Sequence, residues 1–278
     1  MDMDDPAVFP SDALPTLTTR AAAAERRRLD REFQRAVATE QLEIAYQPRI
    51  DLGTGQVMGY EALIRWPVRR RGVVMPDAIL PLAERTKLSE TLGGWVLSRA
   101  CQAAAGWAGP SVCVNVSGRQ VRSAVILAQV SAALVNSGLA PDRLELEMTE
   151  DTLLAGGIDT LIILSGLRDL GVGLLLDNFG TGFGNLVALR RLPLTAIAID
   201  RSLVRDLPDQ PEAVAITQAM IQTGHAMDLM VVAEGIETEA QRAVLAGMGC
   251  DAGQGFLFGQ PALTVPDLAT PDLGRHAA

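Results

Sequence analysis

The 278-residue sequence predicts an α/β fold, namely a (β/α)₈ barrel of the TIM type whose first strand runs antiparallel to its neighbours. From Leu42 onward, short β-branched or aliphatic runs alternate with longer helical runs, which is the pattern of a parallel sheet covered by helices. Residues 51–55 join the first two strands as a turn rather than a helix, which favours an antiparallel hairpin. An open doubly wound sheet is the alternative, but no GxGxxG loop follows an early strand.

The barrel occupies residues 41–265 in this interpretation. Its strand candidates are 43–50, 57–66, 112–116, 144–148, 173–176, 196–199, 230–233 and 254–258. The helix candidates between them are 78–85, 92–105, 124–136, 158–170, 213–227 and 239–246. Outside the barrel we expect a Pro-containing flexible tail at 1–20, a charged helix at 21–40 and a C-terminal tail at 266–278.

Composition excludes several classes of function. The 24 basic and 33 acidic residues give a formal charge of −9, so a nucleic-acid polymer or an acidic membrane is a poor partner. The three cysteines are far apart and fit neither a CxxC site nor a disulfide framework, and two histidines cannot build a histidine-rich zinc site. The start of the chain lacks the basic segment of a signal peptide, and no long apolar run follows. We therefore expect a cytoplasmic protein without membrane insertion.

Polar residues gather at the ends of the predicted strands, where a (β/α)₈ barrel carries its chemistry. The candidates are Glu61, which lies within the second strand, and Asn115, Glu147, Asp177, Asp200, Glu234 and Gln254. A single such residue is more often a helix cap or a core hydrogen bond, but several carboxylates at one mouth repel each other unless a cation neutralises them. Oxygen ligands without His or Cys suit Mg²⁺ or Mn²⁺, and such ions typically serve phosphate chemistry. The sequence therefore predicts a metal-dependent phosphoester site.

Two further residues fit this site less specifically. Arg65 lies four residues after Glu61 and can grip a phosphate, although a surface salt bridge is an equal alternative. Gln47 can read a base or a phosphate, although an exposed strand glutamine is as good an interpretation.

The ordered motifs of residues 29–263 resemble the EAL family of cyclic di-GMP phosphodiesterases. They are YQP at 46–48, YEALIRW at 60–66, PLAE at 81–84, VNVS at 114–117, LEMTE at 146–150, LDNFGTG at 176–182, IDRS at 199–202, VAEGIE at 232–237 and QGFLF at 254–258. The resemblance implies a (β/α)₈-like barrel with a reversed first strand, and hydrolysis of cyclic di-GMP to linear pGpG with Mg²⁺ or Mn²⁺.

The resemblance also implies roles for particular residues. The first metal would be held by Glu61, Asn115, Glu147 and Asp177. Glu234 would act near a second metal and the attacking water, as a catalytic residue together with Glu61 and Asp177. The cyclic di-GMP ligand would meet Gln47, Arg65, Gln254 and Asp200. Glu150 would steady the loop after Asp177, and that loop resembles a segment through which such domains form homodimers.

Two departures from the family pattern bear on activity. Asn178 stands where the family has a second aspartate, and Ala198 stands where it has an active-site lysine. A neutral amide holds a second divalent ion more weakly, and the lost cation removes electrostatic stabilisation worth ~10²–10³ in rate. The leading expectation is therefore a degenerate EAL domain that binds cyclic di-GMP as a receptor, relays the signal to a protein partner and hydrolyses the ligand slowly or not at all. The alternatives are a working phosphodiesterase and an interaction module without nucleotide binding.

Overall fold

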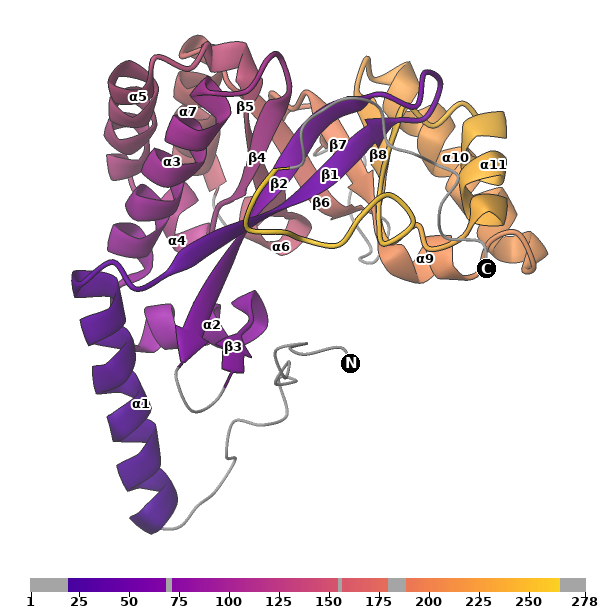
Figure 1. Cartoon of the computed structure of the whole chain (residues 1–278). Helices are drawn as coiled ribbons and strands as arrows, with labels where there is room; N and C mark the ends of the chain where they lie inside the picture. The colour runs from indigo at the N-terminus through magenta and orange to yellow at the C-terminus, as the bar shows by residue number, and fades with distance from the viewer. Residues whose placement is uncertain (1–19, 69–71, 155–156, 180–188, 266–278) are drawn as a thin grey trace.

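The computed structural model describes residues 20–68, 72–154, 157–179 and 189–265. Eight strands close into a barrel in the order β1-β9-β8-β7-β6-β5-β4-β2, and β2 pairs again with β1 (Figure 1). The strands are β1 (Glu43–Asp51), β2 (Val57–Val68), β4 (Ser111–Asn115), β5 (Leu144–Thr149), β6 (Gly173–Phe179), β7 (Ala196–Ile199), β8 (Met230–Ala233) and β9 (Ala252–Gln254). β1 is antiparallel to both of its neighbours, whereas the other pairs around the barrel are parallel. The predicted fold class is confirmed.

The hairpin that reverses β1 depends on a local turn. The Asp51 carboxylate accepts hydrogen bonds from the backbone N–H groups of Gly53 (2.9 Å) and Thr54 (2.7 Å), which closes the chain tightly after β1. The resulting register sets Gln47 opposite Glu61 and Glu43 opposite Arg65. The distal end of β2 leaves the barrel and pairs with β3 (Gly72–Val74), a short strand that the sequence did not predict.

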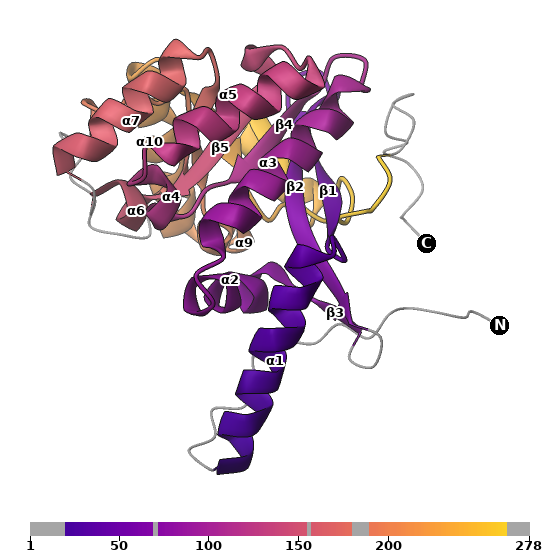
Figure 2. The same ribbon diagram turned by 90° about the vertical axis from the view of Figure 1, so that its left-hand side faces the viewer.

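Helices cover the outside of the barrel (Figures 1 and 2). They are α3 (Ser89–Ala105), α4 (Gly118–Val121), α5 (Val125–Ser137), α6 (Glu150–Leu154), α7 (Gly157–Asp169), α9 (Arg201–Arg205), α10 (Pro211–Ala226) and α11 (Glu239–Gly247), whereas α2 (Pro76–Arg85) lies beside β3, where β2 leaves the barrel. The main core lies between this layer and the sheet and contains fully buried side chains such as Leu97, Leu146 and Leu164. Among the described helices, none has both the length and the apolar character that crossing a membrane requires.

A second, smaller core attaches the N-terminal helix α1 (Arg20–Ala38) to the barrel. Its inner face buries Phe33, whose ring packs edge-on against Trp66 of β2 at 5.4 Å between centroids. Ile79 and Leu82 of α2 complete this core. The rest of α1 extends away from the barrel beside α2 and β3 (Figure 2).

The last strand differs from the prediction. Residues 254–258 were expected to be extended, but β9 ends at Gln254. The backbone N–H of Phe258 donates to the carbonyl of Gly255 at 3.1 Å, which makes a turn, and Phe256 is 60% exposed. The apolar residues of QGFLF therefore belong to a turn that packs on Ile236 and not to the sheet. The short helices α4, α6 and α9 were also not predicted.

Candidate functional site

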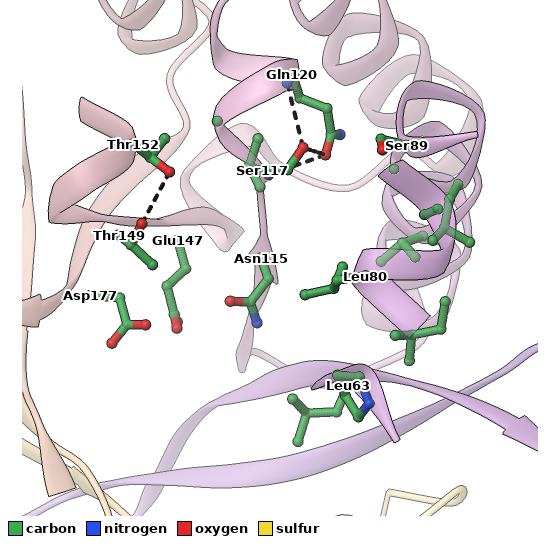
Figure 3. Close-up of a pocket in the computed structure, with 18 of the residues that line it drawn as sticks. Leu63, Leu80, Ser89, Asn115, Ser117, Gln120, Glu147, Thr149, Thr152 and Asp177 are labelled. Atoms are coloured by element: carbon green, nitrogen blue, oxygen red, sulfur yellow. Dashed lines mark hydrogen bonds between the residues drawn. The ribbon is translucent and has the colours of Figure 1, made fainter. Parts of the chain in front are cut away.

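The polar residues expected at strand ends meet at one rim of the barrel. Figure 3 shows Asn115, Glu147 and Asp177, from three successive parallel strands, directed into the same space. Glu234 directly follows β8, and Gln254 ends β9. Because the C-terminal ends of parallel strands share one edge, the topology brings together side chains that lie far apart in the sequence.

Three carboxylates form the centre of the site. One oxygen from each of Glu147, Asp177 and Glu234 lies within 4.8 Å of the other two. Burial raises the pKa of Glu147 to about 8, and the charges of Glu61 and Asp177 add to that rise. Burial also raises the pKa of Asp177 to about 6 and raises that of Glu234 well above its usual range. Such a group holds a high density of negative charge that a divalent cation would neutralise.

Glu61 is fixed by side-chain amides on both of its oxygens. Asn115 Nδ2 donates to Oε1 at 2.6 Å, and Gln254 Nε2 donates to Oε2 at 2.5 Å. Gln254 Nε2 also lies 3.3 Å from Gln47 Oε1, so these hydrogen bonds join β1, β2, β4 and β9 at this corner. Gln254 Oε1 is buried and accepts no hydrogen bond from the residues that the structure describes, which is unusual for a buried polar atom. The corner is therefore rigid and still has an acceptor to offer to a ligand.

Beneath these residues lies a polar floor that the sequence did not predict. Arg49 is 3% exposed and donates from Nη1 to Glu145 at 2.6 Å and from Nη2 to Glu147 at 3.5 Å. The Cys113 thiol donates to the same oxygen of Glu147 at 3.0 Å. Burial alone would lower the pKa of Arg49, but the surrounding acidic groups outweigh burial and raise it above its ordinary value. The alternation of side chains along a strand could have predicted this layer. Arg49, Cys113 and Glu145 each lie two positions from a residue of the mouth on the same strand, so their side chains point to the same side of the sheet.

Asn178 and Ala198, the two departures noted in the sequence, have different surroundings, because only Asn178 contacts one of the three carboxylates. Asn178 has a φ of 58° and donates from its backbone N–H (2.5 Å) and from Nδ2 (3.0 Å) to the two oxygens of Asp177. Ala198 is fully buried in an apolar wall of the barrel interior with Leu175 and Val232. The wall formed by these residues therefore carries no charge.

The other predicted site residues have mixed placements. Arg65 is buried on the same face of β2 as Glu61 and donates to the carbonyl of Ile64 at 3.0 Å. Burial lowers its pKa, and Glu61 opposes that shift. Asp200 caps α9 by accepting from Ser202 N–H at 2.8 Å, so its capping role is structural. Glu150 is buried at the start of α6, whereas residues 180–188, the loop expected to mediate dimerisation, lie outside the described residues.

A cavity of ≈ 470 Å³ leads from the carboxylates toward α2, α3 and α4. Figure 3 shows Leu80 and Leu63 on one side of it and the hydrogen-bonded pair Ser117 and Gln120 at its far wall. Gln120 Nε2 and the hydroxyl of Ser89 are buried there without a hydrogen-bond partner in the described part of the chain. A mostly apolar cavity with a few polar groups is typical of a site for a small organic ligand, and here its acidic end would need a cation before it could hold a phosphate.

Comparison with known proteins identifies the family. A family model described as the EAL domain matches residues 30–261. The chain belongs to the EAL-domain family. This EAL domain is similar to MucR of Pseudomonas aeruginosa, which is named a bifunctional diguanylate cyclase/cyclic di-GMP phosphodiesterase. The two are 38% identical over 246 residues, an alignment that includes 87% of this chain and 36% of MucR. It is 40% identical over 244 residues to the cyclic di-GMP phosphodiesterase NbdA of the same species, covering 31% of NbdA with 86% of its own length.

Solved structures show the same likeness. The PaMucR phosphodiesterase in complex with c-di-GMP superposes with a TM-score of 0.80 at 38% identity, over 84% of this EAL domain and 97% of that chain. The EAL enzyme Bd1971 with bound cAMP and cyclic di-GMP superposes with a TM-score of 0.81 at 29% identity. This superposition covers 87% of this EAL domain and 67% of the Bd1971 chain. The chain spans about a third of the length of the curated relatives named above.

Proposed function

We propose that this EAL domain binds cyclic di-GMP with a divalent cation at the barrel mouth and hydrolyses it slowly to pGpG. The observation that carries the proposal is the carboxylate group of Glu147, Asp177 and Glu234, which lies at the end of a cavity of ≈ 470 Å³. The relatives' names and the ligands in the solved structures support this choice of nucleotide.

The donor set fits Mg²⁺ or Mn²⁺. Glu61, Asn115, Glu147 and Asp177 offer only oxygen donors from adjacent strands, which hard divalent ions prefer. A divalent ion bound there would offset charge on the phosphoryl oxygens and activate a water. Glu234 lies beside these carboxylates, and a bound cation would favour its ionised form, which could accept a proton from that water. Arg65, Gln47 and Gln254 surround the same corner and would contact the phosphodiester.

Slow turnover follows from the two substitutions. Asn178 donates from its amide nitrogen to Asp177 and carries no negative charge, so it would hold a second divalent ion more weakly than an aspartate would. Ala198 leaves the wall formed with Leu175 and Val232 apolar, without a cation to offset charge that develops in the transition state. Ligand contacts and first-metal ligands are retained, so binding should survive better than hydrolysis. A receptor role with a protein partner, and a homodimer, are further parts of this proposal.

A fully active phosphodiesterase is the second candidate. It is favoured by the intact carboxylate group and by relatives that carry the phosphodiesterase name. On this alternative, a local water or another cation replaces the missing lysine.

Calorimetry beside a pGpG assay tests the proposal. With Mg²⁺, cyclic di-GMP should bind at micromolar concentration or tighter, about −8 kcal/mol, while pGpG forms slowly. Glu61→Gln should weaken the metal-dependent part of binding, whereas Glu40→Gln, on the exposed surface, should change nothing. Absence of binding would overturn the proposal in favour of an interaction module, and rapid pGpG formation would favour the second candidate.

A further inference from the structure

A charged side chain crosses the barrel interior below the mouth. Arg49 leaves β1, and its guanidinium reaches Glu145 and Glu147 of β5, which β2 and β4 separate from β1 in the sheet. The distances are 2.6 Å to Glu145 and 3.5 Å to Glu147, and Arg49 is 3% exposed. A buried cation of this kind is stable only when carboxylates surround it.

No other cation of the described residues shares this position. Arg49 and Arg65 are the two basic side chains that are buried in the described part of the chain, and Arg65 donates instead to the carbonyl of Ile64. The remaining interior wall is apolar and is formed by Leu175, Ala196, Ala198, Val232 and Ala252. Arg49 alone therefore offsets the charge of Glu147 from below.

The contacts also orient Glu147. Its Oε2 accepts both from Arg49 and from the Cys113 thiol, whereas Oε1 accepts no hydrogen bond from the described residues. Oε2 of Glu147 is thus fixed by Arg49 and Cys113, whereas Oε1 is available to a ligand at the barrel mouth.

We infer that Arg49 is an internal counter-ion that shares Glu147 with the divalent cation, so that it stabilises the barrel without the ion and lowers the affinity of the site for the ion. The inference rests on the metal site of the proposed function. Two cations that neutralise the same carboxylates oppose each other, because each one reduces the charge that attracts the other. Arg49 is a positioning residue and does not touch the nucleotide.

Removal of one or the other partner of the Arg49–Glu145 ion pair should change the affinity for the metal in opposite directions. Arg49→Met keeps an unbranched side chain and removes the positive charge, so Mn²⁺ should bind about 10-fold more tightly. Glu145→Gln keeps the cation and removes its nearest partner, so Mn²⁺ should bind several-fold more weakly. Arg49→Lys keeps the charge and should bind Mn²⁺ like the unchanged protein. Free Mn²⁺ is measured by electron paramagnetic resonance, without nucleotide.

Thermal unfolding provides the second readout. In EDTA, Arg49→Met should unfold at a lower temperature than the unchanged protein, because Glu145 and Glu147 lose their counter-charge. Addition of Mn²⁺ should raise the unfolding temperature of Arg49→Met by more than it raises that of the unchanged protein. The double variant Arg49→Met with Glu145→Gln should be more stable in EDTA than Arg49→Met alone.

Each outcome decides the inference. Unchanged or weaker Mn²⁺ binding by folded Arg49→Met overturns it, and so does a shift of the two single variants in the same direction. If Arg49→Met does not fold, the double variant Arg49→Met with Glu145→Gln decides: tighter Mn²⁺ binding than in Glu145→Gln alone supports the inference, and equal or weaker binding overturns it. If the unchanged protein binds no Mn²⁺, the proposed metal site fails. In that case the role of Arg49 as a counter-ion is supported only if the double variant Arg49→Met with Glu145→Gln is more stable in EDTA than Arg49→Met alone.

Discussion

Glu147 shows how its surroundings set the chemistry of a single residue. It is 3% exposed, shares an acidic neighbourhood with Asp177 and Glu61, and is contacted from below by Arg49. Burial and like charge favour the protonated acid, whereas the arginine favours the carboxylate. A divalent ion would add to the effect of the arginine, so ion binding and proton release at this residue are linked.

This linkage predicts that the stability of the metal-free protein falls as pH rises. The pKa of Glu147 is raised from 4.5 to about 8 and that of Asp177 from 3.8 to about 6, so the folded state binds more protons than the unfolded state between those values. With more protons on the folded side, the free energy of unfolding decreases with increasing pH across that window. Thermal unfolding in EDTA at a series of pH values measures the slope.

Glu147→Gln is the matched control for this measurement. Because glutamine does not titrate, the decline above about pH 6 should become shallower in this variant. A stability profile that is identical in the two proteins would contradict the placement of Glu147 in the acidic group.

Arg65 is predicted to act on the ligand. Its removal in Arg65→Ala should weaken cyclic di-GMP binding by about 1.5–3 kcal/mol, the contribution of one charge-assisted hydrogen bond. The control is Arg99→Ala, because Arg99 is an exposed residue that pairs with Glu40 away from the mouth. Equal nucleotide affinity in both variants, measured by calorimetry, would remove Arg65 from the binding surface.

Some site residues could be predicted from the sequence and others could not. Glu61, Asn115 and Glu147 are polar residues in predicted strands that are otherwise largely apolar, which makes them conspicuous. Arg49 also lies within a strand, but an arginine between a proline and an isoleucine gives no sign that it crosses the barrel to β5. Cys113 offers only a lone thiol, and its contact with Glu147 depends on the register of β4 against β5.

At the scale of elements, the turn after β9 places Gln254. Gly255 packs so closely on the backbone of Ile236 that an added Cβ would lie 2.1 Å from the carbonyl oxygen of Ile236. Backbone cannot move aside as a flexible side chain can. The sequence places the hairpin after β1 correctly because Asp51 and two glycines specify a turn, whereas QGFLF has strand-like composition and becomes a turn through this contact.

Gly255→Ala should therefore destabilise the fold by about 3 kcal/mol, since forced overpacking against backbone is among the larger effects of a single methyl group. Gly247→Ala is the control: it lies at the end of α11, and an added Cβ meets nothing within 4 Å. That variant should be stabilised by about 0.5–1 kcal/mol. Urea unfolding measures both, and equal stabilities would contradict the close packing at Gly255.

At the scale of the whole molecule, β2 joins the two cores. Its residues Tyr60 and Ala62 belong to the main core, and Ile64 and Trp66 belong to the core under α1. A continuous strand between them favours one cooperative unfolding transition. The α1 helix is thus part of the folded unit, although the family match begins within it.

Phe33→Ala tests this attachment. Loss of the buried ring should destabilise the protein by about 3–5 kcal/mol, and circular dichroism and tryptophan fluorescence should report the same midpoint. Gln34→Ala, on the exposed face of α1, is the control and should change stability little. Two separate transitions in the unchanged protein would show that α1 and the barrel unfold independently.

The central claim is that the barrel binds cyclic di-GMP and turns it over slowly because of Asn178 and Ala198. The most direct test is pGpG formation at saturating Mg²⁺ by the unchanged chain, by Asn178→Asp, by Ala198→Lys and by the double variant. The acidic ligand and the cation would stabilise each other, so their effects should couple rather than add. Each single change should give a small gain, and the double variant a gain on the order of 10²-fold or more. An unchanged chain that already forms pGpG at the rate of the double variant would contradict the account.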